Sequence, residues 1–245
     1  MASDHICIIG SFDSTYDGHL ATRDAVVHAA AAERVVVNTR WITPDELSDP
    51  AAALAGARGA IVACRNPKHP RRLMPDVLGA LTWLRRAGRP TFGIECGFQH
   101  MVIEIARDVL GHADANSVGY DEETTAPVLH RLDPDAPREA GRAPRPREFS
   151  VRAGSRLAAA YAGAPEIREP FRSEFTVNGD YVAELEAAGA SFSADGRLGE
   201  RRFAAAMEWG SLPYYLGVAF LPQFRSTRDE PHPLFRAFLR AAMAR

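Results

Sequence analysis

The sequence has little cysteine, no long apolar run and no excess of positive charge. Its three cysteines, Cys7, Cys64 and Cys96, are an odd number and lack the spacing of metal ligands, so neither a disulfide framework nor a metal site is predicted. No run reaches the roughly 18 apolar residues of a membrane-spanning helix, and the N-terminus lacks the pattern of a signal peptide. We therefore expect a cytoplasmic protein that does not bind membranes.

The formal net charge is −2 at pH 7. A protein that binds nucleic acid usually carries a clear basic excess, because most of its affinity comes from neutralising phosphates. We therefore expect no nucleic-acid partner. The sequence indicates a small molecule as the ligand, predicts no cofactor, and leaves the oligomeric state open.

Short apolar runs alternate with amphipathic segments through the first half of the chain. Strands are expected at residues 5–11, 34–41 and 59–64, and helices at residues 20–33 and 74–88. Strands and helices that alternate at this spacing are typical of a parallel sheet covered by helices on both faces. The fold class predicted is therefore α/β, with a doubly wound, mostly parallel sheet in one domain that spans residues 1–245.

The composition changes to proline, arginine and acidic residues over residues 121–147. This segment has little apolar periodicity, and we predict that it is a long surface excursion within the domain. Short strands are expected after it at residues 149–151 and 156–161, and a buried strand at residues 215–220. Helices are expected at residues 181–188 and 234–244.

The rest of the chain is organised around residues 89–111. An apolar run at residues 90–94 meets the turn GIECG at positions 93–97, and a long amphipathic segment follows. The glycine spacing is that of a nucleophile elbow, a strained turn between strand and helix that exposes its central side chain. The central residue is Glu95, which would lie at the carboxyl end of a strand and near the positive end of a helix. This geometry predicts that Glu95 is catalytic.

Several motifs in this sequence are similar to those of one family. They are the elbow itself, ANS at 115–117, FTVN at 175–178, GVAFLPQF at 217–224 and PHPLF at 231–235. Together they resemble the glutamine amidotransferase domain of CTP synthase over nearly all 245 residues. The resemblance implies the class I glutamine amidotransferase fold, and the chain is identified as a member of the group described as CTP synthase C-terminal-region-related proteins.

The sequence departs from that family at its catalytic residues. The resemblance places the nucleophilic cysteine at Glu95, the catalytic histidine at Leu221 and its acidic partner at Gln223. The glycine-rich oxyanion loop is replaced at residues 64–67, and a substrate-binding glutamate is replaced by Gly119. These concerted changes predict a pseudo-triad without glutaminase activity.

Glu95 and Cys96 are the candidate catalytic residues. Glu95 is predicted to act as a general base or nucleophile, and its structural alternative is a carboxylate that caps the following helix. For Cys96, reactivity and simple packing are weighed equally, because the helix N-terminus favours a thiolate and the neighbouring Glu95 disfavours it.

Five further residues are candidate substrate contacts: Arg65, Asn66, Gln99, Arg172 and His19. Arg65 and Asn66 replace the oxyanion glycines, and a guanidinium there would bind a carboxylate or phosphate, with a solvated surface arginine as the alternative. The resemblance implies that Gln99 and Arg172 contact an amino-acid-like substrate. His19 would supply a titrating group from the loop after the first strand, unless it is merely solvated.

Three classes of function remain open. The first is an enzyme on a small polar or amino-acid-like metabolite, with Glu95 catalysing an elimination, cyclisation, isomerisation or hydrolysis. The second is a thiol-dependent enzyme that uses Cys96, and the third is a non-catalytic ligand-binding or regulatory protein. The lost residues are replaced by another acid, an arginine and a cysteine rather than haphazardly, which favours the first.

Overall fold

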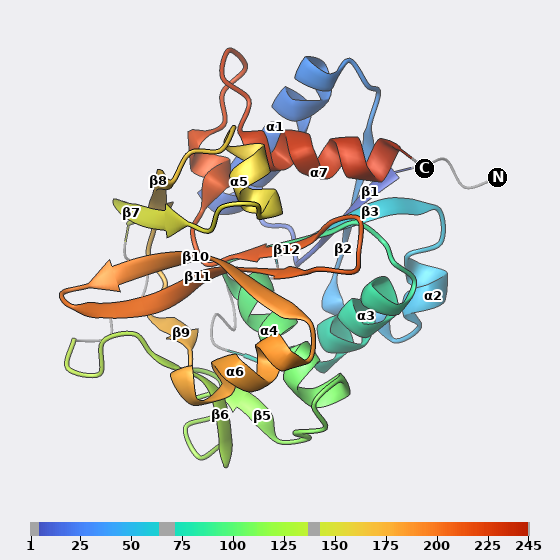
Figure 1. The fold of residues 1–245 in the computed structure, drawn as a ribbon. Helices are drawn as coiled ribbons and strands as arrows, with labels where there is room; N and C mark the ends of the chain where they lie inside the picture. The colour runs from blue at the N-terminus through green and yellow to red at the C-terminus, as the bar shows by residue number, and fades with distance from the viewer. Residues whose placement is uncertain (1–4, 64–71, 137–142, 245) are drawn as a thin grey trace.

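A computed structural model describes residues 5–63, 72–136 and 143–244 (Figure 1). A nine-stranded sheet runs through the molecule in the order β2-β1-β3-β4-β12-β11-β10-β7-β8, and a three-stranded sheet has the order β5-β6-β9. The predicted α/β class is confirmed. No helix within the described ranges is long and apolar enough to cross a membrane.

Five parallel strands form one half of the large sheet. They are β1 (His5–Ile9), β2 (Asn38–Ile42), β3 (Ala57–Val62), β4 (Thr91–Ile94) and β12 (Tyr215–Val218). Strands covered on both faces have almost continuous apolar sequences, and every residue of β4 and β12 is buried. The carboxyl ends of β1, β3, β4 and β12 therefore meet at one edge of the sheet.

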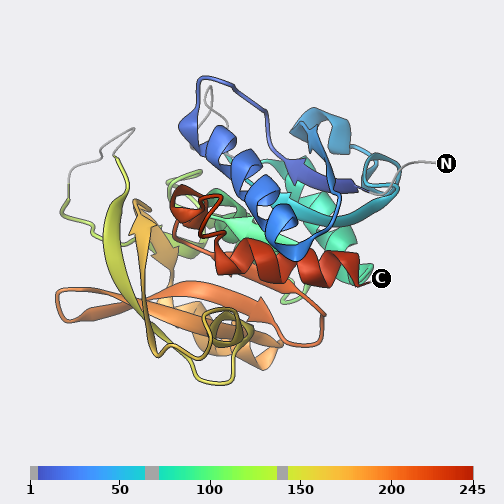
Figure 2. The same cartoon turned by 90° about the horizontal axis from the view of Figure 1, so that it is seen from above.

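Helices cover both faces of this parallel half (Figures 1 and 2). Helices α1 (Asp17–Glu33) and α7 (Pro233–Met243) pack together on one face, and α3 (Pro75–Arg86) and α4 (Cys96–Asp108) pack on the other. Shorter elements between β2 and β3 are η1 (Pro44–Leu47) and α2 (Pro50–Ala53). The four predicted helices of this half are confirmed, with ends within a few residues of those expected.

Four antiparallel strands extend the sheet beyond β12. They are β11 (Arg201–Trp209), β10 (Ala190–Leu198), β7 (Arg145–Val151) and β8 (Glu166–Phe171). The small sheet comprises β5 (Ala115–Ser117), β6 (Ala126–Arg131) and β9 (Phe175–Val177), and α6 (Gly179–Ala187) follows it. The sheet is thus parallel in one half and antiparallel in the other.

The prediction of a strand at residues 156–161 is wrong, because Arg156–Ala160 forms helix α5. The Ser155 side chain caps this helix by accepting a hydrogen bond from the Ala158 N–H at 2.9 Å. The carboxylate of Glu208 accepts two more, from the N–H groups of Arg156 and Leu157, both at 3.0 Å. Capping of the first turn and an alanine-rich sequence stabilise a helix here.

The segment at residues 121–147, expected as a surface excursion, contains β6 and the first residues of β7. Pro146 lies in β7 where that strand pairs with β8 alone, because pairing with β10 covers only Phe149–Val151. A proline lacks the N–H that a second neighbour would need, so it is accommodated at this one-sided position. Composition alone therefore concealed β6 and the first part of β7, whose last residues are those of the strand predicted at 149–151.

Candidate active site

The elbow predicted at residues 93–97 is present as strand, turn and helix. β4 ends at Ile94, α4 begins at Cys96, and Glu95 between them has φ 52° and ψ −103°. This backbone conformation is rare for a residue with a side chain and is typical of functional turns. The Glu95 N–H donates to the Val218 carbonyl at 2.8 Å, so β12 holds the turn in place.

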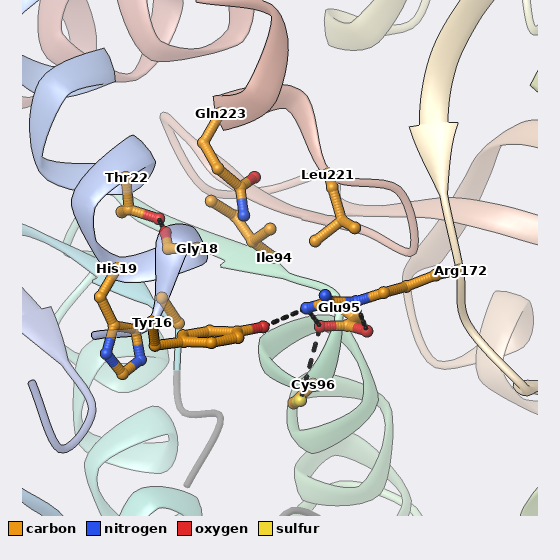
Figure 3. Close-up of a pocket in the computed structure, with 11 residues that line it drawn as sticks. Tyr16, Gly18, His19, Thr22, Ile94, Glu95, Cys96, Arg172, Leu221 and Gln223 are labelled. Carbon is orange, nitrogen blue, oxygen red and sulfur yellow. Dashed lines mark hydrogen bonds and ion pairs between the residues drawn. The ribbon is translucent and has the colours of Figure 1, made fainter. Parts of the chain in front are cut away.

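Glu95 is held by an arginine from the opposite half of the sheet. Arg172, just after β8, donates from Nε to one carboxylate oxygen of Glu95 at 3.0 Å and from Nη2 to the other at 3.1 Å (Figure 3). Burial by itself would lower the pKa of Arg172, but the charge and hydrogen bonds of Glu95 raise the pKa above its ordinary value. The pair is therefore a fixed, bidentate ion pair.

Tyr16 completes this arrangement from the loop before α1. Its hydroxyl oxygen accepts a hydrogen bond from Nη2 of Arg172, and the guanidinium carbon lies 5.7 Å from the centre of the tyrosine ring. Tyr16 was not predicted from the sequence as a site residue. An aromatic residue in the loop after the first strand was the available signal, because such loops border ligand sites in α/β sheets.

A small pocket adjoins Glu95 at the carboxyl edge of the parallel strands (Figure 3). Its volume is about 20 Å³, which is room for about one water molecule. Its lining comes from the carboxyl end of β4 and from the loops and helix starts that follow β1, β3, β4, β8 and β12: Tyr16, Gly18, His19, Thr22, Ala63, Ile94, Glu95, Cys96, Arg172, Leu221 and Gln223. The structure thus brings Glu95, Cys96, Arg172 and His19 together.

Leu221 and Gln223 close the pocket on the side of β12. Both are buried, and Gln223 lies in the short helix η2 (Pro222–Arg225). The side-chain oxygen of Gln223 has no hydrogen-bond partner among the residues that the structure describes. Neither side chain titrates, so the titratable groups of the lining are Tyr16, His19, Glu95, Cys96 and Arg172.

His19 is buried rather than solvated. Its Nδ1 accepts a hydrogen bond from the Asp13 N–H at 2.9 Å, so the proton of the neutral ring is on Nε2. The ring packs against Phe12, Tyr16 and Trp41, with the edge-to-face contact to Tyr16 at 4.8 Å between centroids. His19 therefore packs against the Tyr16 ring and helps to hold it at the wall of the pocket.

Cys96 is half-buried at the first position of α4, and its Sγ lies 4.0 Å from Oε2 of Glu95. Gln99, one turn later, is buried and accepts a hydrogen bond from the Tyr120 hydroxyl at 2.9 Å. Gln99 does not line the pocket beside Glu95. The predicted contacts Arg65 and Asn66, with Cys64, lie outside the described residues.

His100 links α4 to the start of α3. Its Nε2 accepts from the Met74 N–H at 3.2 Å, so Nδ1 carries the proton and donates to the Cys96 carbonyl at 2.8 Å. Burial lowers the pKa of His100 to about 4, although the hydrogen bond to Cys96 acts in the opposite direction. His100 is thus neutral at pH 7 and has both ring nitrogens occupied.

We expect His100 to make the protein less stable as the pH falls from about 6.5 towards 4. An unfolded histidine titrates near pH 6.5, so in this window the unfolded chain binds a proton that the folded chain does not. The free energy of unfolding should fall by about 2 kcal/mol between pH 7 and pH 5 from this group. Urea unfolding at both pH values measures it, with His100→Gln as the control.

The His100→Gln variant should lose less stability over the same interval, because it has no titrating group at this position. The pKa of Glu33 is lowered to about 2, chiefly by its hydrogen bond from Arg240, so Glu33 changes the free energy of unfolding only at lower pH. An equal loss in the wild type and in the variant would show that His100 is not the responsible group.

No cluster of three or more His, Cys, Asp or Glu side chains suited to a metal ion occurs within residues 5–63, 72–136 and 143–244. The functional side chains that line the described pocket are one carboxylate, one thiol, one guanidinium, one phenol and one imidazole.

The chain is similar to CTP synthases over nearly its whole length, while no family model matches it. It is 35% identical over 243 residues to CTP synthase of Rubrobacter xylanophilus, covering 97% of this chain and 43% of that protein. It is 37% identical over 251 residues to the Frankia casuarinae enzyme, covering 98% of this chain and 40% of that protein. The chain thus spans less than half of these relatives.

A solved structure agrees with the sequence comparison. The glutaminase domain of Trypanosoma brucei CTP synthase with bound acivicin superposes with a TM-score of 0.88 and 26% identity. The match covers 99% of this chain and 95% of that domain. The similarity therefore lies in the glutaminase portion of the relatives.

Proposed function

This chain is a CTP synthase glutaminase-like domain with the class I glutamine amidotransferase fold, and from that premise we propose that it is an enzyme on a small carboxylate that uses Glu95 as general base and does not hydrolyse glutamine. The observation that carries the proposal is the Glu95–Arg172 ion pair on the elbow. A carboxylate occupies the position of the family's nucleophile, and a guanidinium fixes it.

The pocket supports the loss of glutaminase chemistry. Amide hydrolysis by this family's mechanism needs a nucleophile, a base that activates it and an acid partner. The corresponding positions here are Glu95, Leu221 and Gln223, and neither Leu221 nor Gln223 can act as an acid or a base. The thiol of Cys96 is one residue away from the nucleophile position and next to a carboxylate.

Arg172 suggests how a substrate enters. The guanidinium offers two parallel N–H groups, and a substrate carboxylate can accept them as Glu95 does. When it does, Glu95 loses its cationic partner and becomes a stronger proton acceptor. The substrate's own carboxylate therefore separates Glu95 from Arg172. The proposed reaction is thereby limited to substrates that carry a carboxylate.

The proposed class of reaction follows from the presence of one catalytic base, the Glu95 carboxylate after Arg172 has left it. A general base of this kind removes a proton from carbon or from a hydroxyl, amine or water, as in an elimination, cyclisation, isomerisation or hydrolysis. Thermal-shift screening against small carboxylates and amino acids identifies the ligand. Binding should disappear in Arg172→Gln and persist in Arg168→Gln, because Arg168 is exposed on the neighbouring part of β8.

We expect Glu95→Gln to separate binding from turnover. The amide has nearly the same shape as the carboxylate but accepts no proton, so turnover should fall by roughly 10²-fold or more. Ligand affinity should be kept or increased, because an amide competes less strongly for Arg172 than a carboxylate. Steady-state kinetics and calorimetry on the same preparations measure both quantities.

Cys96→Ser is the matched control, since it changes the adjacent residue and should alter turnover only slightly. An unchanged rate in Glu95→Gln would rule out the general-base mechanism. If Cys96→Ser abolished activity instead, the thiol-dependent alternative would hold, and iodoacetamide should then label Cys96 faster than Cys7. Cys7 is fully buried, and burial raises its pKa to about 11 despite the opposing charge of Arg40.

A non-catalytic ligand-binding protein is the second candidate, and the small volume of the pocket favours it. With Arg172 and Tyr16 in place, the described pocket beside Glu95 has room for about one water molecule. In that case the substitutions at residues 95, 96 and 172 would change the affinity for a carboxylate, and no preparation would convert it.

A further inference from the structure

A chamber of about 410 Å³ shares Arg172 as a lining residue with the pocket beside Glu95. It is formed by the end of β6, the start of β7, the end of β8 and the end of β10. Its volume is in the range of small-molecule sites, which the pocket beside Glu95 is not. Its charged lining includes Arg131, Arg145 and Arg147 in addition to Arg172.

Arg131 is fixed by neutral groups. Its Nη1 donates to the Pro134 carbonyl at 2.6 Å and its Nη2 donates to the Ala136 carbonyl. Its Nε is shielded from solvent and has no acceptor among the described residues. Carbonyl groups orient a guanidinium but do not neutralise it, and a buried N–H without an acceptor costs free energy. Arg131 is therefore a cation held in a fixed orientation.

Arg147 is oriented by aromatic rings. Its guanidinium carbon lies 5.2 Å from the centre of Phe171 and 5.7 Å from that of Phe203, and its Nη1 donates to the Arg197 carbonyl. A guanidinium stacked in this way is ordered before a ligand arrives, so less side-chain entropy is lost on binding. Arg145 lies two residues earlier on β7, which places its side chain on the same face of the strand.

We propose that this chamber binds a small molecule carrying two or more anionic groups, with Arg131 and Arg147 as its principal contacts and Arg145 as a further one. Two oriented guanidinium groups on separate strands suit two separated carboxylate or phosphate groups. Asp133 and Glu174 also border the chamber. Because these two carboxylates repel anions, the ligand's negative groups are expected to face the arginines and to lie away from Asp133 and Glu174.

The site is separate from the pocket beside Glu95. Arg172 borders both, but its guanidinium is committed to Glu95 and Tyr16. The inference therefore does not rest on the proposed function, and a failure of either one leaves the other standing.

Calorimetry of the full chain at low salt tests this site, with pyrophosphate in one arm and citrate in the other. We expect at least one of the two probes to bind, and its affinity should fall as the salt concentration rises. Tighter binding of pyrophosphate would indicate a ligand with phosphate groups, and tighter binding of citrate would indicate a ligand with carboxylate groups. Arg131→Gln and Arg147→Gln should each lower the affinity about tenfold. Arg168→Gln, which removes an exposed arginine from the adjacent strand β8, should leave the affinity unchanged.

Arg145→Gln covers the case in which Arg147→Gln fails to fold, because Arg145 is exposed and removing its side chain leaves no buried gap. It should lower the affinity about threefold. The inference is overturned if neither probe binds, if Arg168→Gln weakens binding as much as Arg131→Gln does, or if Glu95→Gln abolishes it. The last result would place the anion in the other pocket.

Discussion

Incubated with glutamine, the purified protein is expected to release glutamate no faster than buffer does. An active triad accelerates such chemistry by several orders of magnitude, and removing its nucleophile or base removes most of that factor. Here Leu221 cannot take a proton, and the one histidine in the described pocket lining, His19, uses Nδ1 to accept from Asp13. The measurement is an enzyme-coupled assay of glutamate at high protein concentration.

Cys96→Ala is the control for that assay. It should leave the background rate unchanged, because the thiol is displaced by one residue from the elbow's central position and lies beside the carboxylate of Glu95. Glutamate release clearly above buffer that disappears in Cys96→Ala would contradict the proposed loss of glutaminase activity and would make Cys96 the nucleophile.

Gly97→Ala is expected to destabilise the protein by more than about 3 kcal/mol. A Cβ at this position would lie 1.9 Å from the carbonyl oxygen of Val62 in β3. Backbone atoms of a central strand cannot move aside as a flexible side chain can, so α4 would have to shift away from the sheet. Urea or thermal unfolding measures the loss, and a poor yield of folded protein would be its extreme form.

Gly79→Ala in α3 is the matched control. A Cβ there would lie 4.0 Å from its nearest neighbour, an atom of Pro50, so it fits without strain. Replacing glycine by alanine inside a helix should stabilise the protein by about 0.5–1 kcal/mol. The same substitution is thus expected to have opposite signs in two neighbouring helices. Similar stability in Gly97→Ala and the wild type would show that α4 does not pack on β3 as described.

The elbow could be predicted from the sequence because its signals are local. Glycines at 93 and 97 flank Glu95, and the apolar run before them and the amphipathic run after them give the strand and helix. The Glu95–Arg172 pair could not be predicted, since its members are brought together only when β4 and β8 join the same sheet.

The antiparallel half was the least predictable part of the fold. No helix or strand was predicted at residues 190–209, which form the hairpin of β10 and β11. Ala194, Gly196, Ala204 and Ala205 lie in these strands although alanine and glycine have low β-propensity, and register shifts occur at Ala194. The pairing of β10 with β11, and burial against Phe149 and its aromatic neighbours, outweighed the low β-propensity of these residues.

His19 illustrates a different limit. The pattern of polar residues around it favoured a solvated loop, yet Phe12, Tyr16 and Trp41 enclose the ring. Phe12 and Tyr16 come from the loop just before α1, but Trp41 comes from β2, so the enclosure of the ring is a property of the tertiary structure.

The position of β12 has a consequence for how the molecule folds. This strand lies between β4 and β11, and its residue Val218 accepts the hydrogen bond that fixes Glu95. During synthesis β1, β3 and β4 emerge early, but the central gap beside β4 is filled only after the antiparallel strands have been made. Closing so long a loop carries a high entropic cost and gives the fold a high contact order, which slows folding. The elbow is therefore completed late, and chains that are stalled before residue 218 expose the apolar edge of β4 to other unfinished chains.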